Sequence, residues 1–197
     1  MDSRRREFNF TGAMRRLCED MAARLPELGH LDLDRVAISL CQTRRQVSHG
    51  LYAALTPLRF EAGARQKVLK GRRYAVQRVC DASGQEYLYI LSFYLPRFLN
   101  TSLEEKLSTV LHELWHISPK FDGDLRRHDG RCYAHGPSQR DYDAQMDRLA
   151  QRWLALNPPE HLYEFLADNF EKLIAEHGAV VGAHWPTPKL IALRGNC

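Results

Sequence analysis

The sequence has no apolar run long enough to cross a membrane. Its longest candidate, Tyr87 to Leu95, is about half of the roughly 20 residues that a helical span needs, so we expect a buried strand there. The N-terminus has arginines at positions 4–6 followed by Glu7, and it lacks the apolar core and cleavage site of a signal peptide. We therefore expect a cytoplasmic protein.

Cysteine is scarce and irregularly placed. The five cysteines are odd in number and none forms a CxxC pair. This pattern argues against a disulfide framework and against a zinc ribbon, so buried or incidental thiols are the simpler interpretation. Internal repeats and low-complexity segments are absent as well.

The excess of positive charge is small, with 28 Lys and Arg against 24 Asp and Glu and a net charge of +4. Basic residues cluster at positions 4–6, 65–73 and 126–131. Such clusters more often form a solvated surface than a nucleic-acid site, so nucleic acid is a weakly supported partner. Nothing indicates a membrane partner, and the oligomeric state is not indicated.

The apolar spacing predicts an α+β protein, with a small, mostly antiparallel sheet of three to four strands packed on the helix at about 102–117. We expect a single domain over residues 1–178 and an extended tail over 179–197. The elements expected within the domain are a helix at about 5–26, a sheet at about 35–95, a helix at about 102–117 and two further helices at 138–156 and 157–178. Within the sheet we expect strands at 36–41 and 51–60, with Pro57 at an edge or bulge, and a hairpin of 72–80 with 86–95.

The helix at about 102–117 has the clearest start signal. Thr101 and Ser102 offer N-cap oxygens, and each is followed three residues later by a glutamate, which is the capping-box pattern. Apolar residues then recur at helical spacing and occupy one sector of the helix: Leu103, Leu107, Val110, Leu111, Leu114 and Ile117. Trp115 stands at the border of this sector, where we expect packing in the core.

The same helix carries His112-Glu113-Leu114-Trp115-His116, an HExxH motif. At 100° per residue the two histidines fall together, nearly opposite the apolar sector, so both imidazoles can bind one metal ion. Neutral imidazole suits zinc. Chance alone gives such a motif roughly 0.02 times in a chain of this composition. We therefore predict a zinc site at His112 and His116, with Glu113 as the catalytic base that assists attack of a metal-bound water on a peptide bond.

A catalytic zinc usually has three protein ligands. The metzincin pattern fails, because Pro119 and Asp122 stand where it requires glycine and histidine. His128 is the favoured third ligand, since a glycine upstream lets the chain double back. The rivals are Asp122, His135 and Glu164, with Asp168 beside the last. Four polar residues of the same loop could stabilise an oxyanion, and none is preferred: Arg126, Arg127, Arg131 and Tyr133.

The segment from His112 to His128, HELWHISPKFDGDLRRH, resembles the signature HELxHIPxxFDGxLRxH of the phage-type metallopeptidase family, whose members are similar to the SprT-like zincins. Ser118 departs from the usual proline. The resemblance implies a helix-plus-sheet zincin fold and a third ligand at His128. It covers about 17 residues closely and the context from Val36 more loosely, and it implies no substrate.

Three functions follow as hypotheses. The first is a zinc-dependent peptidase whose extended substrate docks along the strand Tyr87–Leu95. The second is a SprT-like protease that is recruited to DNA and acts on DNA-bound protein; the modest charge and the missing zinc ribbon argue against it. The third is a metal-binding regulatory protein without turnover, which the intact Glu113 argues against.

Overall fold

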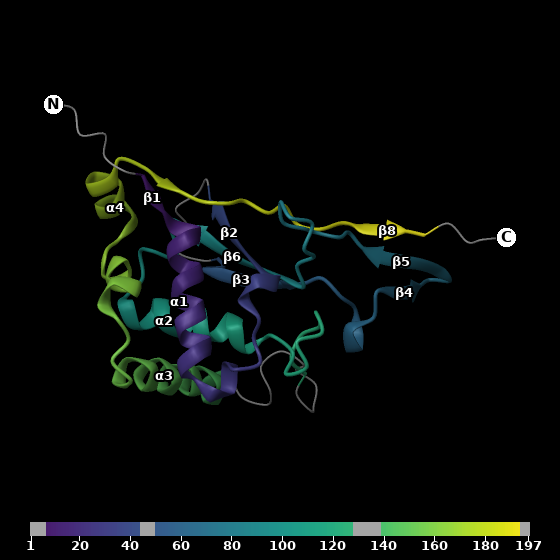
Figure 1. Ribbon diagram of the computed structural model, residues 1–197, viewed down its shortest axis with the longest axis horizontal. Coiled ribbons are helices and arrows are strands. Elements are labelled where there is room, and N and C mark those ends of the chain that lie inside the picture. The colour runs from purple at the N-terminus through teal and green to yellow at the C-terminus, as the bar shows by residue number, and fades with distance from the viewer. Residues whose placement is uncertain (1–6, 44–49, 128–138, 194–197) are drawn as a thin grey trace.

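The computed structural model describes residues 7–43, 50–127 and 139–193. Within these ranges the protein is α+β (Figure 1). Its helices are α1 (Phe10–Arg24), α2 (Leu103–Trp115), α3 (Gln139–Ala155) and α4 (Phe170–His177). Its strands are β1 (Phe8–Asn9), β2 (Val36–Gln42), β3 (Ala53–Pro57), β4 (Gln66–Leu69), β5 (Arg72–Val76), β6 (Tyr89–Leu95), β7 (Val180–Val181) and β8 (Leu190–Ala192). Short 3-10 helices lie in the connections at Pro26–Leu28, Leu33–Arg35 and Glu61–Gly63. No described helix has the length and apolar character of a membrane span.

The central sheet has the strand order β2-β6-β3. Strand β6 is parallel to β2 and antiparallel to β3, so this sheet is mixed and the expectation of a mostly antiparallel sheet is wrong for it. The long apolar run predicted as a strand is confirmed as β6, but it is the middle strand and not an edge. The edge strand beside α2 is β3, and it ends at Pro57 as the missing N–H of proline predicts.

One face of the central sheet packs on the helices and forms the main core. Alternate residues of β6 point into it, including Tyr89, Leu91 and Phe93, and they meet the buried stripes of α1, α2 and α3. The opposite face holds a smaller cluster around Ala37, Leu58 and Ile90. The side chain of Trp185, from the C-terminal segment, packs on this smaller cluster. Because α2 packs against both β3 and α3, it is held firmly in the core.

The predicted hairpin of 72–80 with 86–95 is largely wrong. A turn does form, with a single bridge between Cys80 and Glu86, but β5 and β6 then belong to different sheets. Strand β5 pairs with β4 instead, through the two-residue turn Lys70-Gly71, whose positive φ values of 48° and 77° fit a hairpin turn. Strand β8 pairs with the other side of β5, and Figure 1 shows this second sheet extending away from the helices.

The C-terminal third differs from its prediction in one element. Helix α3 agrees with the expected 138–156, but the expected helix 157–178 is broken into the 3-10 helices Glu160–Leu162 and Glu164–Ala167, followed by α4. Asn157 has a φ of 50°, so it ends α3 and does not cap a new helix. The N-terminal helix, expected at about 5–26, begins at Phe10 because Phe8 and Asn9 pair with β7.

Residues 179–193 run along the body in extended form. The Ala183 carbonyl accepts a hydrogen bond from the Leu40 N–H, and the Trp185 N–H donates to the Ser39 hydroxyl at 2.9 Å. Both bonds join the segment to β2. This segment therefore runs along the outer edge of β2, and its Trp185 packs on the sheet face that the helices leave open.

Candidate metal centre

The position of α2 is fixed by its cap and by its apolar stripe. The Ser102 hydroxyl accepts a hydrogen bond from the Glu105 N–H at 3.2 Å, and the Glu105 carboxylate accepts one from the Ser102 N–H at 3.0 Å, so the capping box is confirmed. All of the predicted stripe is inaccessible to solvent except Leu103, which is half-buried. A helix held in this rotation must present its opposite side away from the sheet.

The two histidines of the motif lie together on that opposite side. The imidazole centroids of His112 and His116 are 4.6 Å apart, and both residues are half-buried. Two imidazoles at this separation on successive turns can supply nitrogen ligands to one ion.

Tyr142 of α3 borders both imidazoles, and no sequence motif predicts this contact. Its ring lies 4.9 Å from that of His112 and 5.9 Å from that of His116. Its hydroxyl oxygen is 3.5 Å from the His112 carbonyl oxygen. Burial, and then the nearby Glu113 carboxylate, raise the pKa of Tyr142 above its usual range. One sequence feature indicates that Tyr142 is buried: its helical spacing from Met146, Leu149 and Trp153 places it on the buried face of α3.

Glu113 is buried between α2 and the edge strand β3, with 9% of its surface exposed. Burial raises the pKa of its carboxyl to about 7, and a hydrogen bond from the backbone of Leu55 acts in the opposite direction. The backbone groups of Tyr52 and Leu58 form hydrogen bonds with the β6 side, to Tyr94 and Leu88. Because alternate residues of an antiparallel strand point to opposite edges, the backbone groups of Ala53 and Leu55 point to the outer side of β3. The carboxyl of Glu113 therefore faces the edge of β3 that pairs with no other described strand.

After α2 the chain turns back on itself. Ile117 pairs with Leu125, and the Arg126 N–H donates to the His116 carbonyl at 2.7 Å. The buried carboxylate of Asp124 accepts hydrogen bonds from the backbone N–H groups of Leu125 and Ala62. Gly123 supplies the reversal with a φ of +88°. A Cβ there would lie 2.5 Å from Cγ of Arg59.

The described residues do not complete a metal site on their own. Among them, no group of three or more His, Cys, Asp and Glu side chains is placed to hold a metal ion. Asp122 and Glu164 therefore do not join the two histidines, although both are rivals for the third position. Asp168, whose carbonyl accepts a hydrogen bond from the buried Lys106 Nζ, is held at the N-terminal end of α2. His128 and His135 lie outside the described residues.

Two of the four loop residues considered for oxyanion stabilisation, Arg126 and Arg127, form contacts within the described part of the chain. The Arg126 guanidinium lies 4.2 Å from the Trp115 ring centroid, and its Nε donates to the Trp115 carbonyl. Arg127 forms two hydrogen bonds with the Asp124 carboxylate. Arg131 and Tyr133 lie outside the described residues. Trp115 is half-buried and packs on the core, as expected.

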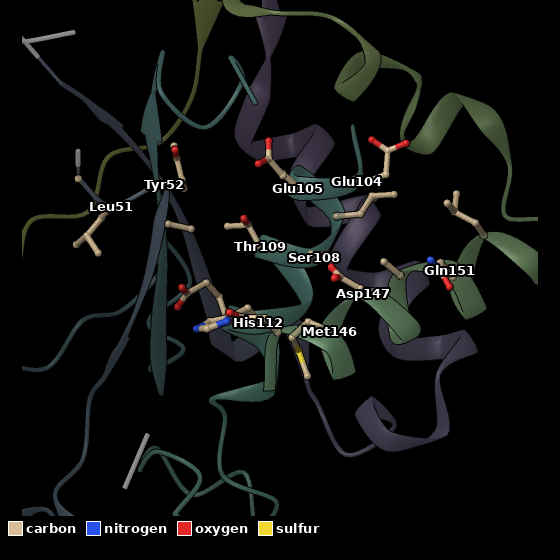
Figure 2. A pocket seen from close by; sticks show the side chains of 17 residues that line it. Leu51, Tyr52, Glu104, Glu105, Ser108, Thr109, His112, Met146, Asp147 and Gln151 are labelled. Carbon is tan, nitrogen blue, oxygen red and sulfur yellow. Dashed lines mark hydrogen bonds between the residues drawn. The ribbon is translucent and has the colours of Figure 1, made fainter. Parts of the chain in front are cut away.

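A groove of about 730 Å³ opens at His112 and Glu113 and runs toward the N-terminal end of α2 (Figure 2). Its walls are α2, α3 and the segment that leads into β3. Apolar side chains line its deeper part, among them Met146, Ala150 and Leu154, while Glu104, Glu105, Asp143 and Asp147 lie along its rim. Its lining contains no Lys or Arg among the described residues. Such a groove can accept an extended chain that passes His112 and Glu113.

The comparisons with known proteins agree with this geometry. Residues 11–153 match the model of the family described as "Putative phage metallopeptidase". This range includes all of α1 except Phe10, the central sheet, α2 and most of α3, and therefore His112, Glu113, His116 and Tyr142. No curated protein and no solved structure matches the chain.

Proposed function

The chain belongs to the phage metallopeptidase family, and from this premise we propose that it is a zinc-dependent enzyme that hydrolyses peptide bonds. The observation that carries the proposal is the pair of adjacent imidazoles on α2 beside a buried Glu113 that faces a strand edge. The donor set fits zinc, because imidazole nitrogen is among its preferred ligands. Zinc held there would act as a Lewis acid on the scissile carbonyl and would lower the pKa of water.

We propose His128 as the third ligand. The Arg126 backbone is hydrogen-bonded to His116, and two residues of chain span at most about 7 Å, so His128 can reach the two imidazoles. The described rivals Asp122 and Glu164 form no metal-binding group with them. A site with three protein ligands keeps a position open for chemistry.

Glu113 has the properties of a general base. A carboxyl with a pKa near neutrality can accept a proton from the attacking water and then deliver it to the nitrogen of the leaving amine. Its burial excludes bulk water from the proton transfer. The hydrogen bond from Leu55 orients the carboxylate toward the edge where a peptide would lie.

We place the substrate along β3. The sequence alone favours the strand Tyr87–Leu95, which contains β6. The outward backbone groups of Ala53 and the carbonyl of Leu55 can pair with an extended peptide by β-augmentation, while the Leu55 N–H donates to Glu113. The groove continues from this edge past His112, so the peptide would cross the catalytic residues. Strand β6 is paired on both sides and offers no such edge.

The test measures zinc content and cleavage of an unfolded protein substrate for the wild type and for Glu113→Gln, His128→Ala and His161→Ala. We expect one zinc per chain in the wild type and a loss of cleavage of at least 100-fold in Glu113→Gln with zinc retained. His128→Ala should weaken zinc binding by at least 10-fold. His161, an exposed histidine of a 3-10 helix, is the matched control and should change neither quantity.

Three results would count against the proposal. A wild type without zinc would remove its basis, and equal activity in Glu113→Gln would exclude the assigned base. Full zinc affinity in His128→Ala would reject that ligand while leaving the peptidase proposal open to another. Zinc bound by four protein ligands, without turnover, would favour a regulatory role.

A further inference from the structure

The sheet β4-β5-β8 carries a concentration of positive charge that the proposed peptidase activity does not use. Residues 62–80 and 187–193 contain seven Lys and Arg and no Asp or Glu, although the whole chain has a net charge of only +4. The remainder of the chain is therefore net negative. We name this sheet with its turn the basic arm, residues 65–78 and 189–192.

Most of these cations are exposed and lack a described partner. Arg65 and Arg78 form ion pairs with Glu86, at 3.4 and 3.0 Å. The other five cations are exposed, and none forms an ion pair within the described part of the chain: Lys67, Lys70, Arg72, Arg73 and Lys189. Five uncompensated charges on one small sheet repel one another, which a polyanion would relieve.

The strand register distributes the charges over both faces of the arm. Lys67 lies opposite Tyr74 and Arg72 lies opposite Leu69, so these two cations share one face. Arg73 lies opposite Val68 on the other face, and Lys70 stands at the turn. A flat anionic surface would contact only one of these faces. A groove with phosphates on both walls would contact both.

The end of the arm has the right size for such a groove. Strand β8 pairs with Tyr74 to Val76, and the Leu193 N–H donates to the Arg73 carbonyl, so within the described residues the hairpin is two-stranded from Arg72 to the Lys70-Gly71 turn. The major groove of B-form DNA is about 12 Å wide and admits a two-stranded ribbon. The major groove of duplex RNA is deep and narrow. Val68, with 61% of its surface exposed, would lie inside the groove as an apolar contact.

We propose that the basic arm binds duplex DNA by inserting the β4–β5 hairpin into the major groove, with cations on both faces reaching the two phosphate backbones. The contacts are mainly electrostatic and therefore independent of sequence. This binding needs neither zinc nor the peptidase site, so it goes beyond the proposed function and can be tested apart from it.

The experiment measures the affinity of the full chain for a fluorescent 20-base-pair DNA duplex over a range of salt concentrations, with chelator present. With three to five phosphates neutralised, the slope of log K against log salt should be about −2.7 to −4.5. Lys67→Gln/Arg72→Gln/Arg73→Gln should reduce the steepness of this slope by about 2.7 and weaken binding at low salt by at least 10-fold. Duplex RNA of the same length should bind more weakly.

The matched control is Arg16→Gln/Arg140→Gln/Arg148→Gln, which removes the same charge from exposed positions of α1 and α3. It should leave the slope within about 1 of the wild type. An equal loss in both triple variants would mean a net-charge effect and would overturn the proposal, as would an affinity that ignores salt. If thermal unfolding shows that the arm variant is not folded, Lys70→Glu at the exposed turn replaces it. Unchanged DNA binding by Lys70→Glu would also overturn the proposal.

Discussion

Gly123 is a point where the loop after α2 can be tested quantitatively. Its φ of +88° lies outside the region that residues with a Cβ adopt, and a Cβ there would lie 2.5 Å from Cγ and 3.0 Å from Cβ of Arg59. Those atoms are close to the backbone of a buried residue, so they cannot swing aside as the end of a side chain can. Gly84 has the same φ of +88°, but a Cβ added to it would meet no other atom within 4 Å.

The pair separates backbone strain from steric overlap. Gly84→Ala should cost about 1–2 kcal/mol of unfolding free energy from strain alone. Gly123→Ala should cost that amount plus about 1–3 kcal/mol for overpacking, or about 2–5 kcal/mol in total. For a domain of this size, the cost of Gly123→Ala lowers the midpoint of thermal unfolding by roughly 4–20 °C.

The assay is urea unfolding of both variants and the wild type, followed by circular dichroism at equilibrium, with zinc removed so that metal binding does not add to stability. The difference between the two variants is the quantity of interest. Equal destabilisation by the two substitutions would refute the assigned contact with Arg59. Because the loop leads to His128, Gly123→Ala should also weaken zinc binding, whereas Gly84→Ala should not.

Three other predictions follow from the same structure. The buried Glu86 carboxylate pairs with Arg59 at 2.8 Å, and although burial alone would raise its pKa, the arginine charges hold that pKa below its usual value. Its contribution to stability is therefore present above about pH 4.5 and lost as the pH falls through the lower folded pKa. Arg59→Met should cost about 1.5–3 kcal/mol at pH 7, because Arg65 and Arg78 still pair with Glu86, and the cost should be smaller at pH 3.5. Urea unfolding at both pH values measures this, and a cost independent of pH would contradict it. Tyr142→Ala should weaken zinc binding about 10-fold in a competition titration, because the ring packs on both imidazoles. Tyr142→Phe keeps the ring and should preserve zinc binding. Equal losses in the two variants would assign the effect to the hydroxyl. Peptides with lysine near the scissile bond should be cleaved about 3- to 10-fold more efficiently than peptides with glutamate there, since the groove rim is acidic. Asp147→Asn should reduce this ratio of cleavage efficiencies. An unchanged ratio would exclude Asp147 from substrate selection.

The sequence predicted α2 well because several local signals agree there. The capping box at Ser102 and the regular apolar spacing specify the start and the buried side of one helix, and the position of His112 and His116 then follows from helical geometry. Strands β2 and β3 were predicted for similar reasons, since short apolar runs and Pro57 are local features. None of these predictions needs knowledge of how distant segments meet.

The errors concern long-range pairing. The turn at Asp81–Gln85 exists, but nothing local reveals that the chain then leaves β5 for another sheet and inserts β6 between β2 and β3. The true hairpin turn, Lys70-Gly71, was missed because lysine is a weaker turn signal than asparagine or aspartate before glycine. Tyr142 was missed because its contact with the histidines depends on how α3 packs against α2.

The charge distribution gives the two proposed surfaces separate roles. The groove beside the histidines is rimmed by carboxylates, whereas the basic arm extends away from the helices (Figure 1). At physiological ionic strength the field of an exposed charge decays over roughly 8 Å, so a polyanion on the arm would not be repelled strongly by the groove. A cationic peptide segment would likewise be drawn to the groove and not to the arm. The two surfaces can therefore be occupied together, and DNA on the arm should leave the cleavage of a short peptide unchanged.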